Sequence, residues 1–236
     1  MSVQTILAID TATENCSVAL GHNGKIFLKS EVAPQKHANL VLGMIDELLT
    51  ENNVDRSAID AIGFGSGPGS FTGVRIAVST AQGLALGLDK KVFGLSDLKL
   101  LVVKELLAKG TSQEPCFGLG CIDARMGEVY LALYSYDGQN INTVISEQVL
   151  KPEDAIAKLK EHQDKLHSNL VLAGSGIAIL QSQDPQLIPG EVKELYPQAD
   201  AIIACAQVEK VDLRDPSEAE PLYCRNEVTW KKIGEQ

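Results

Sequence analysis

The chain has 236 residues, of which 44% are hydrophobic, so it is long and apolar enough to fold as one large or two modest globular domains. Its formal net charge of -10 and its pI of about 4.9 have the wrong sign for a protein that grips a nucleic-acid backbone with its own surface. Its five cysteines form no CxxC pair, which argues against a disulfide framework or a zinc site and indicates reduced thiols.

Neither an export signal nor a membrane span is predicted. The first residues, MSVQTILAID, lack a cationic segment followed by an apolar core, and no later run approaches the roughly 20 apolar residues of a membrane span. We therefore expect a soluble, cytoplasmic protein that makes no contact with a membrane.

Three short strands are predicted at the start of the chain. Residues 5–10 (TILAID) end in Asp10, residues 16–20 follow across a polar turn, and an Asn-Gly turn leads into residues 25–30. An Asp at the end of a first strand, followed by Thr11, can orient magnesium and accept phosphate between two hairpin strands. Any strand-to-turn boundary has this composition, so the turn alone does not decide between a nucleotide site and an ordinary turn.

The first predicted helix covers residues 35–49, where the apolar residues fall on two adjoining stripes. This apolar face is wider than one contact with a sheet needs. His37 stands alone in the helix, because the sequence contains no HxxxH or HExxH pair. We interpret all four histidines as surface or capping residues and predict no metal site.

A glycine- and serine-rich turn, GFGSGPGS, follows the short strand predicted over residues 59–64. Gly67 and Gly69 permit positive φ and a close approach of the backbone. Ser70 or Thr72 can cap the helix that follows. The turn thus delivers the chain from a buried strand directly into a helix.

The first turn of that helix carries no acidic residue and carries Arg75 instead. Free backbone amides beside a cation form the arrangement with which proteins bind an anion, most often phosphate. A tight strand-to-helix turn would have the same glycines, and the sequence leaves both interpretations open.

The helix after the turn is apolar nearly all round, and Gly73, Gly83 and Gly87 let its neighbours approach closely. It must therefore be covered on more than one side. With the helix over residues 35–49 it forms a layer whose outer side we expect to meet another protein chain. Complete coverage of this layer within the chain is the alternative that the pattern leaves open.

The opening pattern recurs after a predicted linker, GTSQEP, at residues 110–115. Residues 117–123 form an apolar strand that ends in Asp123, residues 129–135 form a second strand, and an Asp-Gly turn leads into a third. Strand, Asp, turn, strand, glycine turn and strand thus appear twice. This repetition indicates an internal duplication of a β-meander.

The remaining predicted elements continue the alternation of strands and helices. They are a strand over 92–95, helices that begin at 96–97 and near 152–154, a strand over 170–173 that leads into a glycine turn at 174–176, and a helix over 199–208. We divide the chain into an N-terminal lobe over residues 1–109, a smaller lobe over 110–210, and a tail over 211–236 that docks back on the first lobe.

Four stretches together resemble one protein family: ILAIDTATENCSVAL, GSGPGSFTGVRIAVSTAQGLA, CIDARMGEVYLALY and EPLYCRNEVTW. The sequence is similar to the TsaB (YeaZ) proteins of tRNA threonylcarbamoyladenosine biosynthesis, which belong to the KAE1/TsaD group. The match is most specific over residues 65–85 and loosest over 139–199. The resemblance implies an α/β fold of the actin, sugar-kinase and Hsp70-ATPase type, the ribonuclease H-like ASKHA fold, duplicated into two small lobes.

The resemblance also implies a function. The related TsaD transfers a threonylcarbamoyl group to the adenosine on the 3′ side of the anticodon in tRNAs that read codons beginning with A, and TsaB is its required partner. The chain would then be a non-catalytic scaffold that pairs with TsaD, with itself when alone, and with TsaE in a larger complex, while tRNA binds only through that complex. TsaD holds its metal with an HxxxH pair that is missing here, so we predict no catalytic residue and no metal ligand.

Family members are expected to pair through the N-terminal helical layer. A bulky charge in that layer, as in Ala81→Arg, should then break the pairing. The residues expected at this partner interface are Leu42, Met44, Ile45, Leu49, Ala77, Val78, Ala81 and Leu84.

Two rival functions stay open. An autonomous small ATPase or phosphotransferase of the actin-like fold would use the two acid-tipped hairpins and the glycine turns, but the TATEN turn lacks a glycine for close phosphate contact. A metal-dependent peptidase lacks a ligand set in this sequence. We expect no required cofactor, while a weakly bound or interface-bound ATP or ADP with magnesium stays open. The residues assigned to such a nucleotide or anion site are Asp10, Thr11, Gly67, Gly69, Ser70, Thr72 and Arg75.

Overall fold

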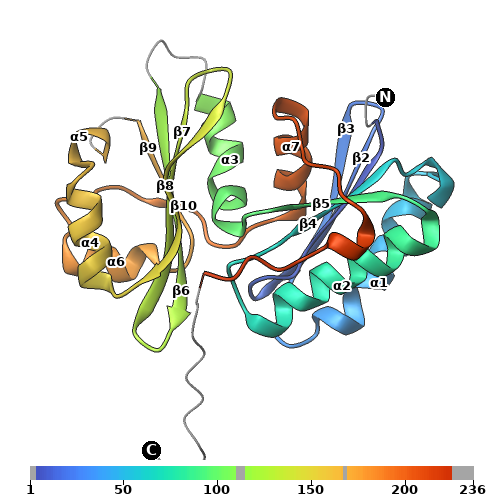
Figure 1. Ribbon diagram of the computed structural model, residues 1–236, viewed down its shortest axis with the longest axis horizontal. Helices are drawn as coiled ribbons and strands as arrows, with labels where there is room; N and C mark the ends of the chain where they lie inside the picture. Colours follow the sequence, from blue (N-terminus) through green and yellow to red (C-terminus); the bar gives the residue numbers. More distant parts are fainter. Residues whose placement is uncertain (1–3, 110–114, 167–168, 225–236) are drawn as a thin grey trace, which may run out of the picture.

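Two five-stranded sheets with the same topology form the framework of the structure, a computed structural model that describes residues 4–109, 115–166 and 169–224 (Figure 1). The first sheet has the order β3-β2-β1-β4-β5, and the second has the order β10-β9-β6-β7-β8. In each sheet the first three strands form antiparallel hairpins, and two later strands extend the sheet in parallel pairing. The predicted duplication of a β-meander is therefore confirmed.

Each sheet takes its strands from one half of the chain. The first sheet contains β1 (Ile6–Asp10), β2 (Asn15–His22), β3 (Lys25–Val32), β4 (Ala61–Gly65) and β5 (Lys91–Leu95). The second contains β6 (Cys116–Arg125), β7 (Glu128–Tyr136), β8 (Ile141–Leu150), β9 (Leu170–Ala173) and β10 (Val192–Glu194).

Helices cover both faces of each sheet (Figure 1). The outer face of the first sheet carries α1 (His37–Glu51) and α2 (Phe71–Leu88), and the outer face of the second carries α4 (Pro152–Lys160), α5 (Gln163–Leu166) and α6 (Ile177–Gln183). Between the sheets lie α3 (Asp97–Lys109) and α7 (Ala199–Val208). Two short 3-10 helices, η1 (Arg56–Ala58) and η2 (Pro216–Glu218), complete the elements.

The two inner helices are exchanged between the lobes. α3 follows the first sheet in the sequence but packs against β6, β7 and β9, whereas α7 follows the second sheet but packs against β1, β2 and β4. Strand glycines make this possible, since a Cβ on Gly120 would lie 2.4 Å from the carbonyl oxygen of Leu98 in α3. On the other side, a Cβ on Gly63 would lie 2.5 Å from Ile202 in α7. A boundary at residue 109 thus separates the sheets but not the helices packed on them.

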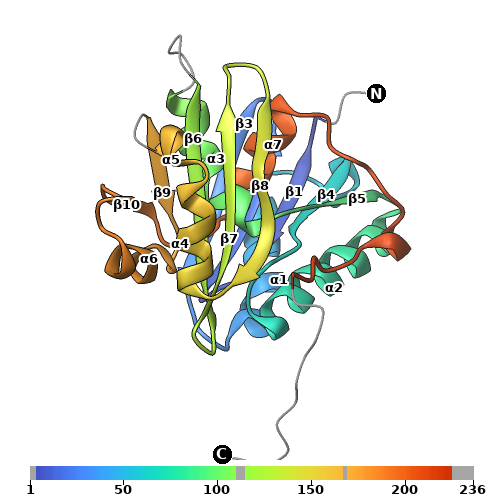
Figure 2. The ribbon, with the colours of Figure 1, turned by 60° about the vertical axis from the view of Figure 1, so that its left-hand side comes forward.

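The described part of the tail, which ends at Cys224, runs along the first lobe. Arg214 pairs with Val92 of β5, and the Leu222 N–H donates to the carbonyl oxygen of Ser66 (2.7 Å). Figure 2 shows this segment passing beside α2. Most of the predicted linker, one of the four histidines and the end of the tail with its tryptophan lie outside the described residues.

The predicted strands and helices are all present, and the structure adds five short elements among the described residues: α5, α6, β10, η1 and η2. β10 has three residues and α5 has four, too few for a hydrophobic period to mark them in the sequence. All five cysteines are free thiols. No helix in the described parts of the chain combines the length and the apolar content that crossing a membrane requires.

Candidate functional site

The glycine turn before α2 is filled by the first hairpin of the same chain. Ser70, one of the two predicted caps, accepts a hydrogen bond from the Gly73 N–H (3.4 Å), and its own N–H donates to the carbonyl oxygen of Ala12 (2.7 Å). The Thr11 hydroxyl donates to the carbonyl oxygen of Gly73 (2.7 Å). A Cβ on Gly69 would lie only 2.3 Å from the Ala12 oxygen. These glycines therefore let the turn and the hairpin pack together, and backbone occupies part of the predicted anion site.

Two buried carboxyl groups contact each other beneath this turn. Asp10 and Asp97 are 1% and 0% exposed, and Oδ2 of Asp10 and Oδ1 of Asp97 have no donor among the described residues. Their other oxygens accept backbone hydrogen bonds, Asp10 from Ala12 (2.9 Å) and Asp97 from Gly67. Burial raises the pKa of both carboxyls, and the negative charge of Asp10 helps to hold the pKa of Asp97 well above its usual range. One proton shared between the facing oxygens satisfies both groups.

This pair gives Asp10 a different setting from the one that the sequence suggests. A strand-end Asp beside a Thr-rich turn predicts an accessible ligand for magnesium, whereas here the carboxyl is enclosed by protein. Asp97 was predicted only to start a helix, and its side chain instead ties the start of α3 to Gly67 of the glycine turn. Nothing local in the sequence signals this contact, because it joins segments that meet only in the folded chain.

The second lobe repeats the arrangement at its own hairpin. Asp123 Oδ1 accepts a hydrogen bond from the Arg125 N–H (2.8 Å), as at the first hairpin. A Cβ on Gly174 would lie 2.1 Å from the carbonyl oxygen of Cys121, so the second glycine turn also serves close packing. The Arg125 guanidinium pairs with Asp123 (3.2 Å) and with Glu14 of the first lobe (3.0 Å). The two hairpin turns are thus joined across the gap between the lobes.

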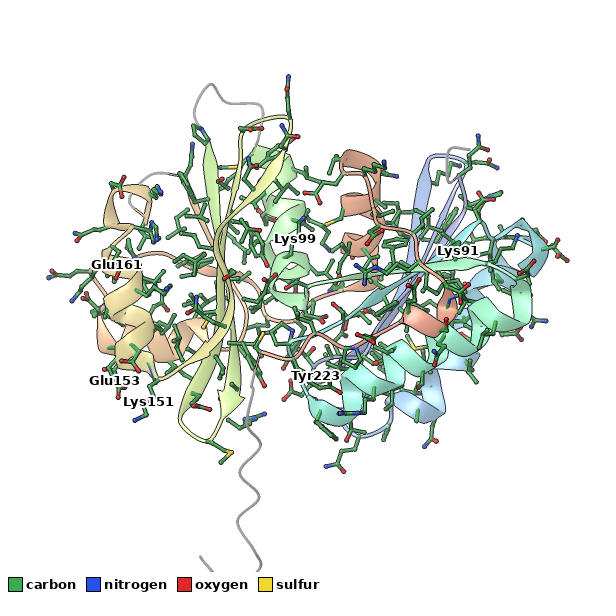
Figure 3. All side chains as sticks on the ribbon, in the orientation of Figure 1. Lys91, Lys99, Lys151, Glu153, Glu161 and Tyr223 are labelled. Carbon is green, nitrogen blue, oxygen red and sulfur yellow. The ribbon has the colours of Figure 1, made fainter. Side chains whose placement is uncertain are left out.

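A cavity of about 1060 Å³ lies between the lobes, which we call the interlobe cavity. Its walls come from the β1–β2 turn, the starts of α1 and α2, the β6–β7 turn and the described end of the tail. Figure 3 shows Tyr223 of the tail in the middle of the molecule, near the start of α2. Of the predicted nucleotide or anion residues, Gly69, Ser70 and Arg75 line the cavity. Four others do not line it: Asp10, Thr11, Gly67 and Thr72.

His37 lines the interlobe cavity from the start of α1. Its interpretation as a surface or capping residue is wrong, because it is 7% exposed and its Nε2 atom is buried without a hydrogen-bond partner. A lone histidine in a helical pattern gives no local sign of such burial. In the described parts of the chain, no three His, Cys, Asp or Glu side chains gather in a way that could hold a metal ion.

Most residues predicted for the partner interface lie in the core of the first lobe. Leu42 is the exception, with 56% of its surface exposed. Met44 and Leu84 are partly buried and pack against the core. The other five are buried in it: Ile45, Leu49, Ala77, Val78 and Ala81. The inner sides of the two helices are therefore covered within the chain, but the layer is not covered completely, as the exposed Leu42 shows.

The outward sides of α1 and α2 present a second set of residues. Gly43, Gly83 and Gly87 lie at exposed positions where an added Cβ would meet no atom within 4 Å. Leu86 is 62% exposed beside them in the sequence. We call the surface formed by these residues the outer helical face, and its members are Leu42, Gly43, Ser79, Gly83, Leu86 and Gly87.

The chain is a two-lobed α/β protein of the actin-like ASKHA fold. Three features define this class: two sheets with the same topology, helices on both faces of each sheet, and a hairpin with an aspartate at its turn in each lobe. A family model described as "TsaD: tRNA N6-adenosine threonylcarbamoyltransferase" matches residues 29–227.

Individual relatives identify the family within this fold. The proteins called tRNA threonylcarbamoyladenosine biosynthesis protein TsaB from Escherichia coli (strain K12) and Haemophilus influenzae are each 38% identical to this chain over 97% of both partners. A crystal structure from Pseudomonas aeruginosa, described as an uncharacterized protein with similarity to the peptidase YeaZ, is 35% identical and has a TM-score of 0.75. The match covers 94% of this chain and 100% of that one. The chain belongs to the TsaB family.

Proposed function

We propose that the chain acts in the biosynthesis of threonylcarbamoyladenosine in tRNA as the non-catalytic partner of TsaD. It pairs with TsaD through the outer helical face, pairs with a second copy of itself when TsaD is absent, and joins TsaE in a larger complex. TsaD transfers the threonylcarbamoyl group to the adenosine on the 3′ side of the anticodon, and tRNA binds only to the complex. Membership of the TsaB family supports the pathway, since relatives over nearly the full chain carry that name.

The glycines of the outer helical face carry the proposal of an interface. A glycine in the interior of a helix costs about 1 kcal/mol of stability relative to alanine. Gly43 and Gly83 lie inside α1 and α2, and no described atom occupies the space where their Cβ atoms would be. No closer packing within the chain therefore compensates for the stability that these two glycines cost their helices. A helix of another chain that crosses closely would explain them, because glycine lets two backbones approach each other.

The two exposed leucines support the same surface. Leu42 and Leu86 are 56% and 62% exposed and flank the glycines on α1 and α2. The cores of protein interfaces are depleted in charge and enriched in apolar area. Small residues at the crossing and leucines beside it form a surface of that composition.

The environment of the glycine turn supports a non-catalytic role. The Ser70 N–H binds the Ala12 carbonyl oxygen, and the Gly67 N–H binds Asp97, so neither is free to bind a phosphate. Asp10, which an ATPase of this fold would use, is enclosed by protein. The net charge of -10 is consistent with tRNA contact that depends on the partner.

Size-exclusion chromatography with light scattering tests the proposal. The chain alone should run as a homodimer and should exchange into a one-to-one heterodimer when TsaD is added. Leu86→Glu places a charge in the outer helical face and should abolish both assemblies. Leu195→Glu is the matched control, because Leu195 is 52% exposed in the second lobe and its replacement should change neither.

Ala81→Arg is not used, since Ala81 is fully buried and an arginine there would perturb the fold itself. Unchanged assembly of Leu86→Glu with TsaD would contradict the interface. Stoichiometric ATP hydrolysis by the purified chain alone, lost in a folded Asp10→Asn variant, would favour the autonomous ATPase.

A further inference from the structure

The first sheet has one covered edge and one open edge. At β5, the Val92 N–H donates to the carbonyl oxygen of Arg214 (3.0 Å) and the Arg214 N–H donates back to that of Val92 (2.8 Å), so the tail covers this edge. At the other edge, β3 pairs with β2, and no second strand of the described residues lies beside it. The unpaired N–H and C=O groups of an edge strand can pair with another chain.

Alternate residues of β3 direct their backbone groups away from the sheet. The pairing with β2 continues just past the end of β3, where the Ala33 N–H donates to the carbonyl oxygen of Glu14 (3.0 Å). In an antiparallel pair, residues that bond to the neighbouring strand alternate with residues whose N–H and C=O point outward. The odd-numbered residues of β3 therefore bond to β2. The outward-pointing residues are Ile26, Leu28, Ser30 and Val32.

The side chains of β3 leave this edge unprotected. Ile26 and Leu28 are each 38% exposed, and Val32 is 58% exposed. Proteins commonly shield an edge strand with charged side chains, proline or a bulge. β3 contains no proline and pairs with β2 in unbroken register, while Lys29 in its middle is held by two glutamates of α1. In β8, an edge strand of the second sheet, no large apolar side chain is exposed.

The charges of β3 are complementary to those of a second, antiparallel copy of the strand. Lys25 and Glu31 are exposed near its two ends, and neither forms an ion pair with a described residue. When Leu28 lies opposite Leu28 of a second copy, Lys25 faces Glu31 at both ends of the pair, which stabilises it. This register also pairs outward-pointing residues with each other, since Ile26 meets Ser30. A shift of the two-fold axis by one residue in either direction places lysine opposite lysine.

We propose that the open edge of β3 pairs with β3 of a second copy of the chain, antiparallel about a two-fold axis at Leu28, so that two first sheets join edge to edge. Such an isologous contact closes on itself and gives a dimer. One strand pair is small beside the interfaces of stable dimers, so the contact is weak and forms at high concentration. It uses neither Leu42 nor Leu86, is separate from the outer helical face, and does not depend on the proposed pairing with TsaD.

Sedimentation velocity of the Leu86→Glu chain tests this contact, because that change removes pairing through the outer helical face. We expect a monomer–dimer equilibrium at concentrations close to millimolar, well above those of chromatography. Adding Lys25→Glu should weaken dimerisation about tenfold, because two attractive contacts become repulsive. Adding Glu31→Lys as well should restore dimerisation. Lys193→Glu makes the same change of charge at an exposed position of β10 and is the matched control, which should dimerise like its parent.

Disulfide cross-linking of the full chain reports the register directly. Leu28→Cys places a thiol of each copy at the two-fold axis, where paired Cα atoms lie about 5.5 Å apart, within reach of a disulfide. In Ile26→Cys the two thiols lie about 13 Å apart along the strands, so this variant is the control. Oxidation with copper phenanthroline should link the first variant and not the second, and the unmodified chain, oxidised in parallel, accounts for its own cysteines.

Three results would each overturn the proposal. They are dimerisation that is insensitive to Lys25→Glu, equal cross-linking of Leu28→Cys and Ile26→Cys, and a Leu86→Glu chain that stays monomeric close to millimolar concentration. Loss of TsaD binding in Leu86→Glu leaves the β3 contact untouched, so failure of this contact and failure of the outer helical face are observed separately.

Discussion

Replacing Asp97 by asparagine and by alanine separates the shape of this side chain from its ionisation. Alanine removes the acceptor of the Gly67 N–H and the group that shares a proton with Asp10. Each buried polar group left unsatisfied costs roughly 1–3 kcal/mol, so Asp97→Ala should lower the free energy of unfolding by roughly 2–6 kcal/mol. That is a large part of the roughly 5–15 kcal/mol by which domains are stable.

Asparagine should preserve the contacts. Its oxygen can accept from Gly67, and its NH₂ group can donate to Asp10 in place of the shared proton. We expect the free energy of unfolding of Asp97→Asn at neutral pH to equal that of the unmodified chain or to exceed it, because an amide cannot ionise and no second negative charge can then form beside Asp10.

The raised pKa of Asp97 makes the free energy of unfolding depend on pH, and the sign of this dependence can be derived. The pKa of Asp97 is raised in the folded chain and close to its usual value in the unfolded chain, so the folded chain binds more protons between these values. The stabilisation by protonated Asp97 is fully present below the pKa that this carboxyl has in the unfolded chain. It is lost as the pH rises through the raised pKa that the carboxyl has in the folded chain. The loss reaches at most about 1.4 kcal/mol per pH unit for one proton.

Urea unfolding followed by far-ultraviolet circular dichroism, at several values between about pH 5 and about pH 8, measures this effect. The stability of the unmodified chain minus that of Asp97→Asn should fall as the pH rises, and the subtraction cancels the carboxyls whose pKa is lowered, such as Asp60. A difference that stays constant with pH, or an Asp97→Asn variant as unstable as Asp97→Ala, would refute the shared proton.

Two glycines of α2 and the accessible thiol give further predictions. Gly83→Ala should stabilise the isolated chain by up to about 1 kcal/mol in urea unfolding, because its Cβ enters open space, and should weaken assembly in chromatography. Gly73→Ala should instead destabilise the chain by about 1–3 kcal/mol, since its Cβ would lie 2.1 Å from the Thr11 carbonyl oxygen, and equal effects of the two changes would contradict this assignment. Iodoacetamide should alkylate Cys224 before the four buried cysteines of the folded chain, as counted by mass spectrometry. The alkylation rate should rise with pH toward the pKa of about 11 to which burial raises this thiol. Early alkylation of the buried Cys121 would contradict the packing of the second lobe.

Local chemistry explains why so many elements could be predicted. The alternation of apolar and turn residues marked both hairpin repeats, and the helical period marked α1, α2 and α7. Ser70 could be identified as a possible cap because the capping hydrogen bond spans only three residues. The apolar width of α1 and α2 also indicated contacts on more than one side. Such signals depend on neighbours in sequence, and they persist whatever the rest of the chain does.

Contacts between segments that lie far apart in the chain could not be predicted from the sequence. The pairing of Asp97 with Asp10 and the burial of His37 depend on the way in which strand ends and helix starts meet at the gap between the lobes. The exchange of α3 and α7 depends on glycines in the strands of the opposite lobe. A sequence that is read locally contains the residues of these contacts but not their partners.

Most of the elements, the duplication and the resemblance to the TsaB family could be predicted from the amino-acid sequence alone. Only the tertiary structure decided what each glycine is for. Gly73 and Gly83 lie on the same helix, yet the first makes room for the carbonyl oxygen of Thr11, and the second faces open space. The physical reason is that a glycine in a sequence records only that a side chain is absent, whereas the fold determines whether the same chain fills the space or leaves it to a partner.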